Sequence, residues 1–581
     1  MVWANAERFA EAIAFRRRVD GSWIDVTTKD FAAHVLAIAK GFIAAGVGDG
    51  DRIALLARTR YEWTLIDFAI WTVGAVTVPV YETSAPEQVA WILADSGAKA
   101  VVVETDEHRR TVEGVVDRST EVVGVWQLDI TPETPGTAAA VDELTAVGAT
   151  VSDREVHERR LAVRSCDVAT LVYTSGTTGR PKGVELTHRN LLAEIRADIA
   201  AFPTLMRPGN SMLVFLPLAH VFARAIALCC VYSRVTLGHL PDVRNLVSDL
   251  ATFRPTFVVA VPRVFEKIYN SAKQRAHSDG KGRIFDATET LPIEYSTALS
   301  GGGPSVSLRA RHAAANAVVY TRLRGVLGGR CVAAISGSAP LGEHLAHFFR
   351  GVGVPVYEGY GLTETSAAIC VNTENAFRVG TVGRPVAGAS VRIADDGEIS
   401  VRGEMVFNGY WRNAESTADV LDDGWFRTGD LGTIDADGYL RITGRKKEII
   451  VTAGGKNVAP AVLEDGVRRH PLVSQCVILG DRQPFIAALV TLDEDFLPRW
   501  AAKRGKSTAA ANLVRDPTLR AEIQDAIDSA NRMVSRAESI REFVILPHDF
   551  TEAAGELTPS MKVRRDVVAK SYADEIAAIY R

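Results

Sequence analysis

The chain has 581 residues, of which 47% are hydrophobic and 23% are charged, proportions that exclude a disordered or fibrous protein. Its formal net charge of −4 gives no overall basic field for nucleic acid, and its six scattered cysteines include no C-x-x-C pair or zinc-like spacing. No apolar run approaches the roughly 20 residues that span a bilayer, and the first residues lack a secretory signal pattern, so we expect a cytoplasmic protein.

Five short aliphatic and β-branched runs alternate with helix-like stretches in the first half of the chain. They lie at residues 52–56, 75–80, 100–103, 213–216 and 257–261. Such alternation is typical of parallel α/β layers. The Gly-, Ala- and Thr-rich residues 132–151 are expected to form a surface loop.

Residues 173–184 read YTSGTTGRPKGV, a loop crowded with hydroxyl groups and glycines. Glycine reaches positive φ and has no Cβ, so backbone N–H groups here can turn toward a bound phosphate. A short apolar strand at 167–173 precedes the loop, and Thr187 and Asn190 have the spacing of a helix start. We therefore expect the loop to join a strand to a helix. A Walker A loop is excluded because glycine follows Lys182, and a solvated linker is the alternative.

The second half of the chain changes character twice. Residues 272–330 predict a mainly helical excursion from the sheet, and the chain becomes β-like from about residue 390, with DADG at 435–438 as a hairpin turn. The last residues, 569–581, predict an amphipathic helix. The predicted fold class is α/β, with a large multi-subdomain N-terminal domain over 1–444, a hinge at 445–447, and a small α+β C-terminal domain over 448–581.

Four further motifs follow the phosphate loop in a fixed order. They are YEGYGLTET at 357–365, WFRTGD at 425–430, GRKKEII at 444–450 and LTPSMK at 557–562. With them the chain resembles the adenylate-forming (ANL) superfamily of acyl-CoA synthetases, luciferases and peptide-synthetase adenylation domains, over nearly its whole length. Within that superfamily it is most similar to long-chain fatty-acid–CoA ligases of the actinobacterial type, through LPLAHVF at 216–222, VPRVFEK at 261–267 and VTAGGKNVAP at 451–460.

The resemblance implies two half-reactions and three small-molecule partners. A fatty acid carboxylate attacks the α-phosphate of ATP to give acyl-AMP and pyrophosphate, and the thiol of coenzyme A then displaces AMP. Because a carboxylate is a weak nucleophile, such an enzyme has to position both reactants and neutralise phosphate charge. The implied cofactors are ATP, Mg²⁺ and coenzyme A.

The resemblance also implies which residues hold the nucleotide. They are Thr174, Ser175, Gly176, Thr177, Thr178, Gly179 and Lys182 around the β- and γ-phosphates, Gly337 and Ser338 beside the adenine, and Glu358, Gly359, Tyr360, Gly361 and Thr363 around the base and the α-phosphate. Glu364 with Thr174 is the implied Mg²⁺ site, because Mg²⁺ takes one or two carboxylates plus phosphate oxygens and water. The alternatives are a solvated carboxylate for Glu364 and a packing role for Tyr360.

Charged residues of the later motifs complete the implied site. Asp430 accepts the ribose hydroxyls, with a turn-forming aspartate as the alternative, and Arg445 contacts the ribose or phosphate rather than being a solvated surface charge. Lys562 matches the family's adenylation lysine, whose ammonium bridges the fatty carboxylate and the α-phosphate. An exposed lysine near a C-terminus is its alternative.

Three positions are implied to serve the exchange between the half-reactions. His220 lies beside the acyl carboxylate and separates it from the thiol, although alone it would be read as a core histidine. Lys447 matches the hinge about which the C-terminal domain rotates. Gly454 and Gly455 then let the pantetheine pass close to the backbone.

Several rival functions remain open on the sequence. The acceptor is either coenzyme A or a carrier protein, although no insertion of the kind that hinders rotation lies between Glu364 and Arg384. The acid is either a long-chain one, as the helical excursion suggests by resemblance, or a medium-chain or aryl acid. A non-catalytic nucleotide sensor is disfavoured by the presence of Glu364, Asp430 and Lys562. No nucleic-acid partner is expected, and peripheral membrane contact and a homodimer stay open.

Overall fold

The computed structural model describes residues 1–116, 122–129, 139–174, 180–278, 285, 288–507, 509–558 and 562–581. It divides into two compact units. The first comprises Met1–Val391, Val401–Arg427 and Gly438–Leu440, and the second comprises Arg392–Ser400, Thr428–Asp437 and Arg441–Arg581. The predicted fold class, a large α/β unit followed by a smaller one, is confirmed. The predicted hinge at 445–447 stays a prediction.

The first unit contains a seven-stranded sheet in the order β18-β8-β7-β4-β3-β5-β6. Its strands are β3 (Arg52–Leu56), β4 (Val76–Val80), β5 (Ala98–Val103), β6 (Gly124–Gln127), β7 (Val168–Thr174), β8 (Lys182–Thr187) and β18 (Gly409–Tyr410). The strands from β7 to β6 pair in parallel, as the sequence predicts, whereas β8 and β18 pair antiparallel at the other edge. Residues 53–56 are buried on both faces, as expected of a parallel strand covered by helices.

A nine-stranded sheet, also within the first unit, has the order β15-β14-β13-β12-β11-β9-β10-β1-β2. Its strands are β1 (Ile13–Val19), β2 (Ser22–Thr27), β9 (Ser211–Val214), β10 (Thr236–His239), β11 (Phe257–Ala260), β12 (Ala333–Ser336), β13 (Val356–Leu362), β14 (Ala367–Val371) and β15 (Arg384–Pro385). The strands from β1 to β13 in this order are parallel. Their carboxyl ends therefore share one edge, where ligands of open α/β sheets bind.

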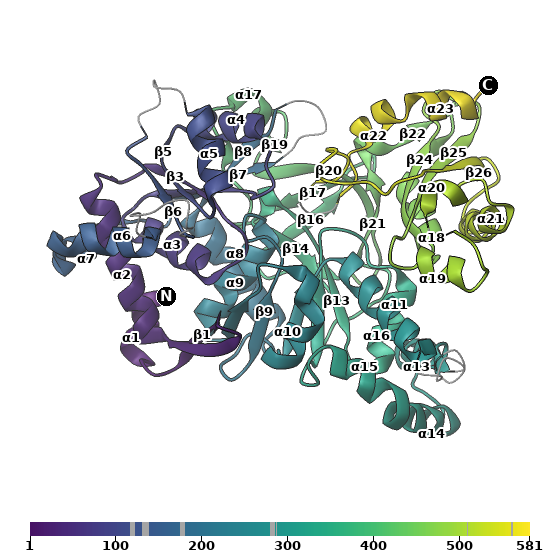
Figure 1. The fold of residues 1–581 in the computed structure, drawn as a ribbon, viewed down its shortest axis with the longest axis horizontal. Coiled ribbons are helices and arrows are strands. Elements are labelled where there is room, and N and C mark those ends of the chain that lie inside the picture. Colours follow the sequence, from purple (N-terminus) through teal and green to yellow (C-terminus); the bar gives the residue numbers. More distant parts are fainter. Residues whose placement is uncertain are drawn as a thin grey trace. The chain divides into compact units, whose positions relative to one another are not determined.

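Helices cover both sheets of the first unit (Figure 1). They are α1 (Val2–Arg8), α2 (Thr28–Ala44), α3 (Tyr61–Thr72), α4 (Pro86–Ser96), α5 (Asp106–Val115), α6 (Ala140–Val147), α7 (Asp153–Ala162), α8 (His188–Ala201), α9 (Val221–Ser233), α10 (Leu246–Phe253), α11 (Pro262–Ser278), α13 (Leu291–Ser300), α14 (Val306–Ala315), α15 (Thr321–Val326), α16 (Glu343–Val352) and α17 (Ala414–Ala418). The predicted helical excursion is confirmed by α13, α14 and α15, and in Figure 1 α13 and α14 extend away from the strands.

The predicted surface loop over 132–151 is wrong for its described part. Residues Ala140–Val147 form helix α6, which packs on α2. The contact is very close, because a Cβ on Gly41 of α2 would lie 2.3 Å from the Leu144 carbonyl oxygen. Glycine therefore allows the two helix backbones to meet, and this tertiary contact stabilises a helix too short to be stable alone.

A five-stranded sheet carries the residues at which the chain passes between the units. It comprises β16 (Ser390–Ile393), β17 (Glu398–Arg402), β19 (Leu421–Asp422), β20 (Trp425–Ile434) and β21 (Leu440–Arg445). The predicted hairpin is confirmed, since β20 and β21 pair across residues 435–439, and Asp437 N donates to Asp435 Oδ1 at 3.0 Å.

The rest of the second unit has a mixed three-stranded sheet, β24-β25-β26, and a two-stranded ribbon, β22-β23. Its elements are β22 (Ile450–Val451), β23 (Asn457–Val458), β24 (Val473–Leu479), β25 (Ile486–Leu492), β26 (Ile540–Ile545), α18 (Pro460–Arg468), α19 (Leu497–Ala502), α20 (Ala510–Leu513), α21 (Pro517–Asn531), α22 (Arg565–Ser571) and α23 (Ala573–Ile579). The predicted single C-terminal helix is wrong, because it breaks at Tyr572, whose ring packs 6.0 Å from that of Phe550. Among all described residues, no helix combines the length and the apolar character needed to cross a bilayer.

Candidate functional site

The predicted phosphate loop connects two antiparallel strands. β7 ends at Thr174, β8 starts at Lys182, and these two residues pair across the hairpin. The expectation that the loop leads directly into a helix is wrong, because β8 intervenes. Val184 and Leu186 are both fully buried, the two-residue period of a strand, and helix α8 begins only after Thr187. The predicted contacts Ser175, Gly176, Thr177, Thr178 and Gly179 lie outside the described residues.

The predicted start of helix α8 is confirmed. Thr187 N donates to Asn190 Oδ1 at 2.8 Å, and Asn190 N donates to Thr187 Oγ1 at 3.2 Å, which forms a reciprocal capping box. The cap fixes the end of β8, which is the second strand of the hairpin that β7 and β8 form around the predicted phosphate loop.

Tyr410 contacts both Lys182, at the start of β8, and Glu364, the predicted Mg²⁺ ligand. It lies on β18 and pairs with Val184 of β8. Tyr410 Oη donates to Glu364 Oε1 at 2.9 Å, and Lys182 Nζ lies 5.1 Å from the centroid of the Tyr410 ring. Burial and then the Glu364 carboxylate raise the pKa of Tyr410, so the phenol stays protonated and donates. Lys182 also donates to Ser416 Oγ at 2.8 Å.

The turn that carries Glu364 is held in an unusual backbone conformation. Thr363, Glu364 and Thr365 form one turn of 3₁₀ helix, and the next two residues, Ser366 and Ala367, have φ values of 61° and 154°. Non-glycine residues in these regions cost energy and persist only where their surroundings hold them. Here Ser366 Oγ donates to the Met405 carbonyl oxygen at 2.8 Å, and the Glu364 carbonyl oxygen accepts from Phe407 N at 2.8 Å.

The loop after β12 has the backbone expected beside a bound base. Ser338 has a φ of 70°, and a Cβ on Gly337 would lie 3.3 Å from the Phe222 ring. Both residues follow Ser336 at the carboxyl end of a parallel strand. Gly337 and Ser338 therefore lie at the edge of the nine-stranded sheet where ligands of open α/β sheets bind, and their place beside the adenine stays a prediction.

Strand β13 carries Glu358, Gly359, Tyr360 and Gly361, with Thr363 directly after it. Glu358 is buried and its Oε1 accepts from Leu341 N at 2.9 Å, so this carboxylate fastens the Gly337–Ser338 loop to β13. A Cβ on Gly361 would lie 1.5 Å from the Ala367 carbonyl oxygen. Gly361 therefore has a packing role that the sequence did not indicate.

His220 caps helix α9 at the end of the loop after β9. Its Nδ1 accepts from Phe222 N at 3.2 Å, and its own N–H donates to the Pro217 carbonyl oxygen at 3.0 Å. The acceptor role at Nδ1 leaves Nε2 as the protonated nitrogen of the neutral ring. Thr59 Oγ1 donates to the Leu216 carbonyl oxygen at 2.7 Å, which ties this loop to the segment between β3 and α3.

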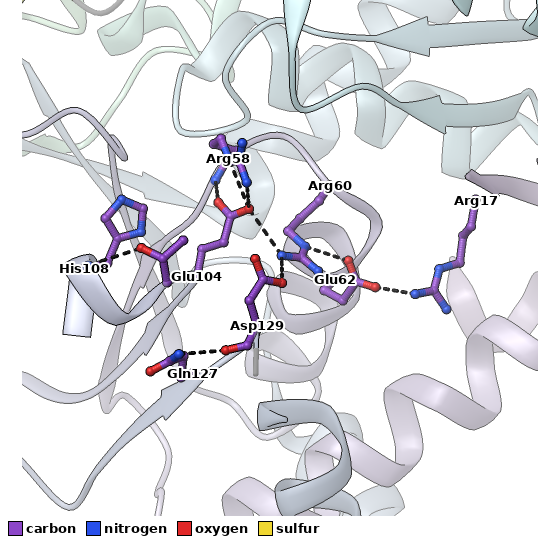
Figure 2. Close-up of polar contacts among 9 residues, drawn as sticks. Arg17, Arg58, Arg60, Glu62, Glu104, His108, Gln127 and Asp129 are labelled. Carbon is purple, nitrogen blue, oxygen red and sulfur yellow. Dashed lines mark hydrogen bonds and ion pairs between the residues drawn. The ribbon is translucent and has the colours of Figure 1, made fainter. Parts of the chain in front are cut away.

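Figure 2 shows a charged network that fixes the segment containing Thr59. Arg58 Nη2 lies 2.7 Å from Glu104 Oε1, Arg60 Nη1 lies 2.7 Å from Asp129 Oδ1, and Arg60 Nε lies 2.8 Å from Glu62 Oε2. Burial alone would raise the pKa of Glu104, but hydrogen bonds from Arg58 and the charges of both arginines hold it below its usual value. The network joins the carboxyl ends of β3, β5 and β6, and no sequence motif indicates it.

The predicted ribose ligand has a fixed position within the second unit. Asp430 is buried, and its Oδ1 lies 3.1 Å from Arg445 Nε. The preceding Gly429 has a φ of 73° and donates its N–H to Glu398 Oε1 at 3.0 Å. Glu398 Oε2 in turn accepts from Lys446 Nζ at 2.9 Å. Glu398 therefore links the turn before Asp430 to Lys446, which lies within the predicted hinge, a role that sequence reasoning missed.

The other predicted residues of the second unit lie on short loops and turns. Lys562 N donates to Thr558 Oγ1 at 3.1 Å, and Thr558 N donates to the Lys562 carbonyl oxygen at 2.8 Å. Lys447 lies in a 3₁₀ turn, Lys446–Glu448. A Cβ on Gly455, whose φ is 75°, would meet no atom within 4 Å, and one on Gly454 would come no closer than 3.9 Å to its nearest neighbour. A side chain at either position would therefore meet open space.

The candidate residues are thus divided between the units. The first unit carries Thr174, Lys182, His220, Gly337, Ser338, Tyr360, Thr363 and Glu364, and the second carries Asp430, Arg445, Lys447, Gly454, Gly455 and Lys562. Within the described ranges, no group of three or more His, Cys, Asp or Glu side chains could hold a metal ion unaided. One carboxylate beside the predicted phosphate-binding hairpin instead suits an Mg²⁺ ion carried by a triphosphate.

Comparison with known proteins shows full-length similarity. The family model of AMP-binding enzymes matches residues 2–411, and that of the AMP-binding enzyme C-terminal domain matches residues 447–581. Long-chain-fatty-acid–CoA ligase FadD15 of Mycobacterium tuberculosis is 53% identical over 585 residues, covering 100% of this chain and 96% of that protein. Long-chain-fatty-acid–CoA ligase ACSBG2 of Xenopus laevis is 30% identical, covering 99% of this chain and 82% of its own.

Solved structures agree on the fold. The o-succinylbenzoate coenzyme A synthetase of Bacillus subtilis in complex with ATP and magnesium ion has a TM-score of 0.69 at 20% identity, covering 97% of this chain and 98% of its own. The two family models together span most of the chain in the predicted order. The chain therefore belongs to the family of AMP-binding enzymes, which confirms the resemblance seen in its motifs.

Proposed function

We propose that this chain is an ATP-dependent long-chain fatty acid–CoA ligase. In the first step a carboxylate oxygen forms a bond to the α-phosphorus and pyrophosphate leaves. In the second step the coenzyme A sulfur, having lost its proton, attacks the acyl carbonyl carbon and AMP leaves. Full-length identity of 53% to a ligase of this name supports the substrate class.

The observation that carries this proposal is the cluster of Lys182, Tyr410 and Glu364. A cation from the phosphate hairpin and a buried carboxylate both contact one tyrosine. Triphosphate binding needs a cation, and its Mg²⁺ needs a hard oxygen ligand nearby, so the two side chains serve adjacent parts of one ligand. When bound, the Mg²⁺ would neutralise phosphate charge. Glu364 and the Thr174 hydroxyl would hold it.

The remaining residues are assigned by the family resemblance, and their chemistry fits the assigned roles. In the first unit, Thr363 donates to the α-phosphate, Tyr360 with Gly337 and Ser338 contacts the adenine, and His220 borders the acyl carboxylate. In the second unit, Asp430 and Arg445 hold the ribose, and the Lys562 ammonium stabilises charge that develops during adenylation. Gly454 and Gly455 leave room for the pantetheine arm.

The proposal is tested by pyrophosphate release and by coenzyme A consumption across acids from about C2 to C24. Long acids should support both reactions with a higher kcat/KM than medium-chain or aryl acids, since each buried CH₂ contributes about 0.8 kcal/mol to binding. Pyrophosphate release without coenzyme A consumption would instead indicate transfer to a carrier protein. Release with no acid at all would point to a different reaction.

Tyr410→Phe is expected to weaken use of Mg·ATP about tenfold. The change removes one hydrogen bond to the Glu364 carboxylate, which contributes about 1.5 kcal/mol, while the ring beside Lys182 is retained. The measurement is the apparent KM for ATP in pyrophosphate release as Mg²⁺ is varied. Tyr295→Phe, on helix α13 away from these residues, is the matched control. An unchanged Mg²⁺ dependence in Tyr410→Phe would show that its phenol does not orient Glu364.

Lys447→Pro is expected to separate the two half-reactions. Proline fixes φ and so prevents a backbone pivot at this 3₁₀ turn. Pyrophosphate release from fatty acid and ATP should continue, whereas acyl-CoA formation should slow by at least about tenfold. Lys447→Ala removes the same charge but leaves the backbone free, and it should form acyl-CoA at nearly the normal rate. A normal thioester rate in Lys447→Pro would place the pivot elsewhere.

We also propose a cytoplasmic enzyme that touches membranes peripherally. The helical segment supports such contact, because Val306 and Val318 are exposed on or beside α14, which also carries Arg309 and Arg311. Apolar side chains among basic ones favour the surface of an anionic bilayer.

A further inference from the structure

Helix α8 presents a stripe of three buried polar side chains, Asn190, Glu194 and Asp198. They are four residues apart and so lie on one face of the helix, one above the other. Buried polar groups usually have hydrogen-bond partners, and a buried carboxyl is costly without them. Backbone groups opposite this stripe supply hydrogen-bond partners for two of the three side chains, Asn190 and Glu194.

Asn190 binds the segment that leads to one side of the Glu364 turn. Its Nδ2 donates to the carbonyl oxygens of Glu404 and Val406, at 2.7 and 2.9 Å. The next residue, Phe407, donates its N–H to the Glu364 carbonyl oxygen at 2.8 Å. The first turn of α8 is therefore connected to the predicted metal ligand through a single stretch of chain.

Glu194 binds the other side of the same turn. Its Oε1 accepts from Ala368 N at 2.5 Å. Ala368 directly follows Ser366 and Ala367, the two residues held at positive φ. A hydrogen bond at this place opposes relaxation of the strained turn, since the turn can straighten only if β14 shifts. α8 thus supports the Glu364 turn on both of its flanks.

Glu194 and Asp198 form a carboxyl pair enclosed by apolar surroundings. Glu194 is fully buried, and its Oε2 has no hydrogen-bond partner among the described residues. The titratable group that faces the pair from α9 is the Cys229 thiol, whose Sγ donates to Asp198 Oδ2 at 3.7 Å, and the neighbouring Cys230 thiol interacts with Cys229. On β14, the group facing Glu194 is the Ala368 N–H.

Burial sets the charge of this pair. Burial and then the Asp198 charge raise the pKa of Glu194, and burial raises the pKa of Asp198. Burial also raises the pKa values of the two thiols, which stay neutral. Because both carboxyl pKa values are raised, the folded state binds more protons than the unfolded state. The stability that the protonated pair contributes is full in acid and is lost as the pH rises.

We propose that Glu194 is a positioning residue for the metal–nucleotide site. Together with Asp198, which lies on the same face of α8, it holds Ala368 and thereby the turn that aims Glu364, and this support weakens when both buried carboxyls are ionised. This inference rests on the proposed function, in which Glu364 binds the Mg²⁺ of Mg·ATP. When Glu194 and Asp198 are both ionised, the repulsion between their buried carboxylates pushes the Glu194 side chain away from Ala368 N.

The test is the thermal stabilisation by Mg·ATP of the full chain, measured from about pH 6.5 to about pH 9. For the natural sequence this increment should shrink as the pH rises. Glu194→Gln keeps an acceptor for Ala368 N but has no proton to lose, so its increment should be independent of pH. Asp198→Asn should behave in the same way. Glu194→Leu removes the acceptor and should bind Mg·ATP about tenfold more weakly at every pH.

If Glu194 had a merely structural role, each variant would have a lower melting temperature, but the rise in melting temperature on adding Mg·ATP would be unchanged. Glu289→Gln, which removes a partly buried carboxyl with a raised pKa on the helical segment, is the control and should keep the pH dependence. The proposal is overturned if Glu194→Gln retains the alkaline loss, and this variant decides the matter even if Glu194→Leu does not fold. Absence of pyrophosphate release with every acid, alongside normal Mg·ATP binding, would reject the proposed function but not this inference.

Discussion

Lys562→Ala is expected to lose adenylate formation by about 10²–10³-fold while retaining most of the thioester half-reaction. Charge grows on the α-phosphate as the carboxylate attacks, and the compact ammonium of lysine offsets it. In the thioester half-reaction the sulfur attacks the acyl carbonyl carbon rather than the α-phosphorus, and Lys562 is not proposed to act in that step. The measurements are pyrophosphate release from fatty acid and ATP, and acyl-CoA formation from acyl-AMP and coenzyme A.

The local backbone makes this variant interpretable. Two hydrogen bonds between Thr558 and Lys562 involve the Lys562 backbone and not its side chain, so truncation leaves them intact. Lys570→Ala removes an exposed lysine from the nearby helix α22 and serves as the control. Lys562→Arg tests geometry at constant charge and should recover only part of the rate. Equal loss of both half-reactions in Lys562→Ala would contradict the assigned role.

The parallel parts of the fold were readable from sequence because they depend on local pattern. Runs such as residues 53–56 are buried on both faces and read as continuous apolar stretches. The errors arose where long-range contacts decide the structure. β8 depends on antiparallel pairing with β7, and α6 is held by the close approach of Gly41 to Leu144. The contact of Gly41 with Leu144 leaves no local periodic signal, and the alternation of Val184 and Leu186 in β8 is only a short one.

In the candidate site, too, residues within local motifs were predicted from the sequence, whereas residues that depend on tertiary contacts were missed. Glu364, Asp430 and Lys562 lie in recognisable motifs because their chemistry fixes both residue type and spacing. Tyr410 and Glu398 were missed, since Tyr410 lies 46 positions from Glu364 and Glu398 lies 31 from Gly429. Glu194 was missed for another reason. On a helix of mixed polarity a glutamate is normally taken as solvated, and only tertiary structure shows it to be buried.

A second expected result concerns the stability of the first unit. Arg224 of α9 and Asp67 of α3 form a fully buried, two-point ion pair, with Nε–Oδ2 and Nη2–Oδ1 distances of 2.9 and 2.5 Å. Thr77 Oγ1 donates to Asp67 Oδ1 at 2.7 Å, and Arg224 Nη1 donates to Thr170 Oγ1 at 2.7 Å. The pair thus joins α3 and α9 to strands β4 and β7.

Two tryptophans enclose the guanidinium of this pair. The Arg224 Cζ lies 5.4 Å from the Trp63 ring centroid and 5.0 Å from that of Trp71. A cation over an aromatic face is stabilised, more so when water is excluded. Arg224 also lies one helical turn from His220, since Arg224 N donates to the His220 carbonyl oxygen at 3.2 Å. The ion pair therefore stabilises the helix end that carries a predicted catalytic residue.

Arg224→Met is expected to lower the free energy of unfolding by roughly 3–5 kcal/mol, because it leaves the Asp67 carboxylate buried without its partner. Asp67→Asn should cost less, because a neutral amide can still accept from Thr77. The double variant should be more stable than the sum of the two losses predicts, since it contains no unpaired buried charge. Urea unfolding followed by tryptophan fluorescence measures all three, with Trp63 and Trp71 as local reporters.

The activity of these variants shows whether the ion pair of Arg224 and Asp67 only stabilises the first unit or also positions the start of α9. If the pair only stabilises the first unit, Arg224→Met should keep its kcat below its melting temperature. If the pair also sets the start of α9, kcat should fall while the KM for Mg·ATP stays constant, because we propose that His220 borders the acyl carboxylate and not the triphosphate. Strict additivity in the double variant would show that the two side chains do not interact energetically, despite their contact, and that the cost of Arg224→Met comes from lost packing against the tryptophans.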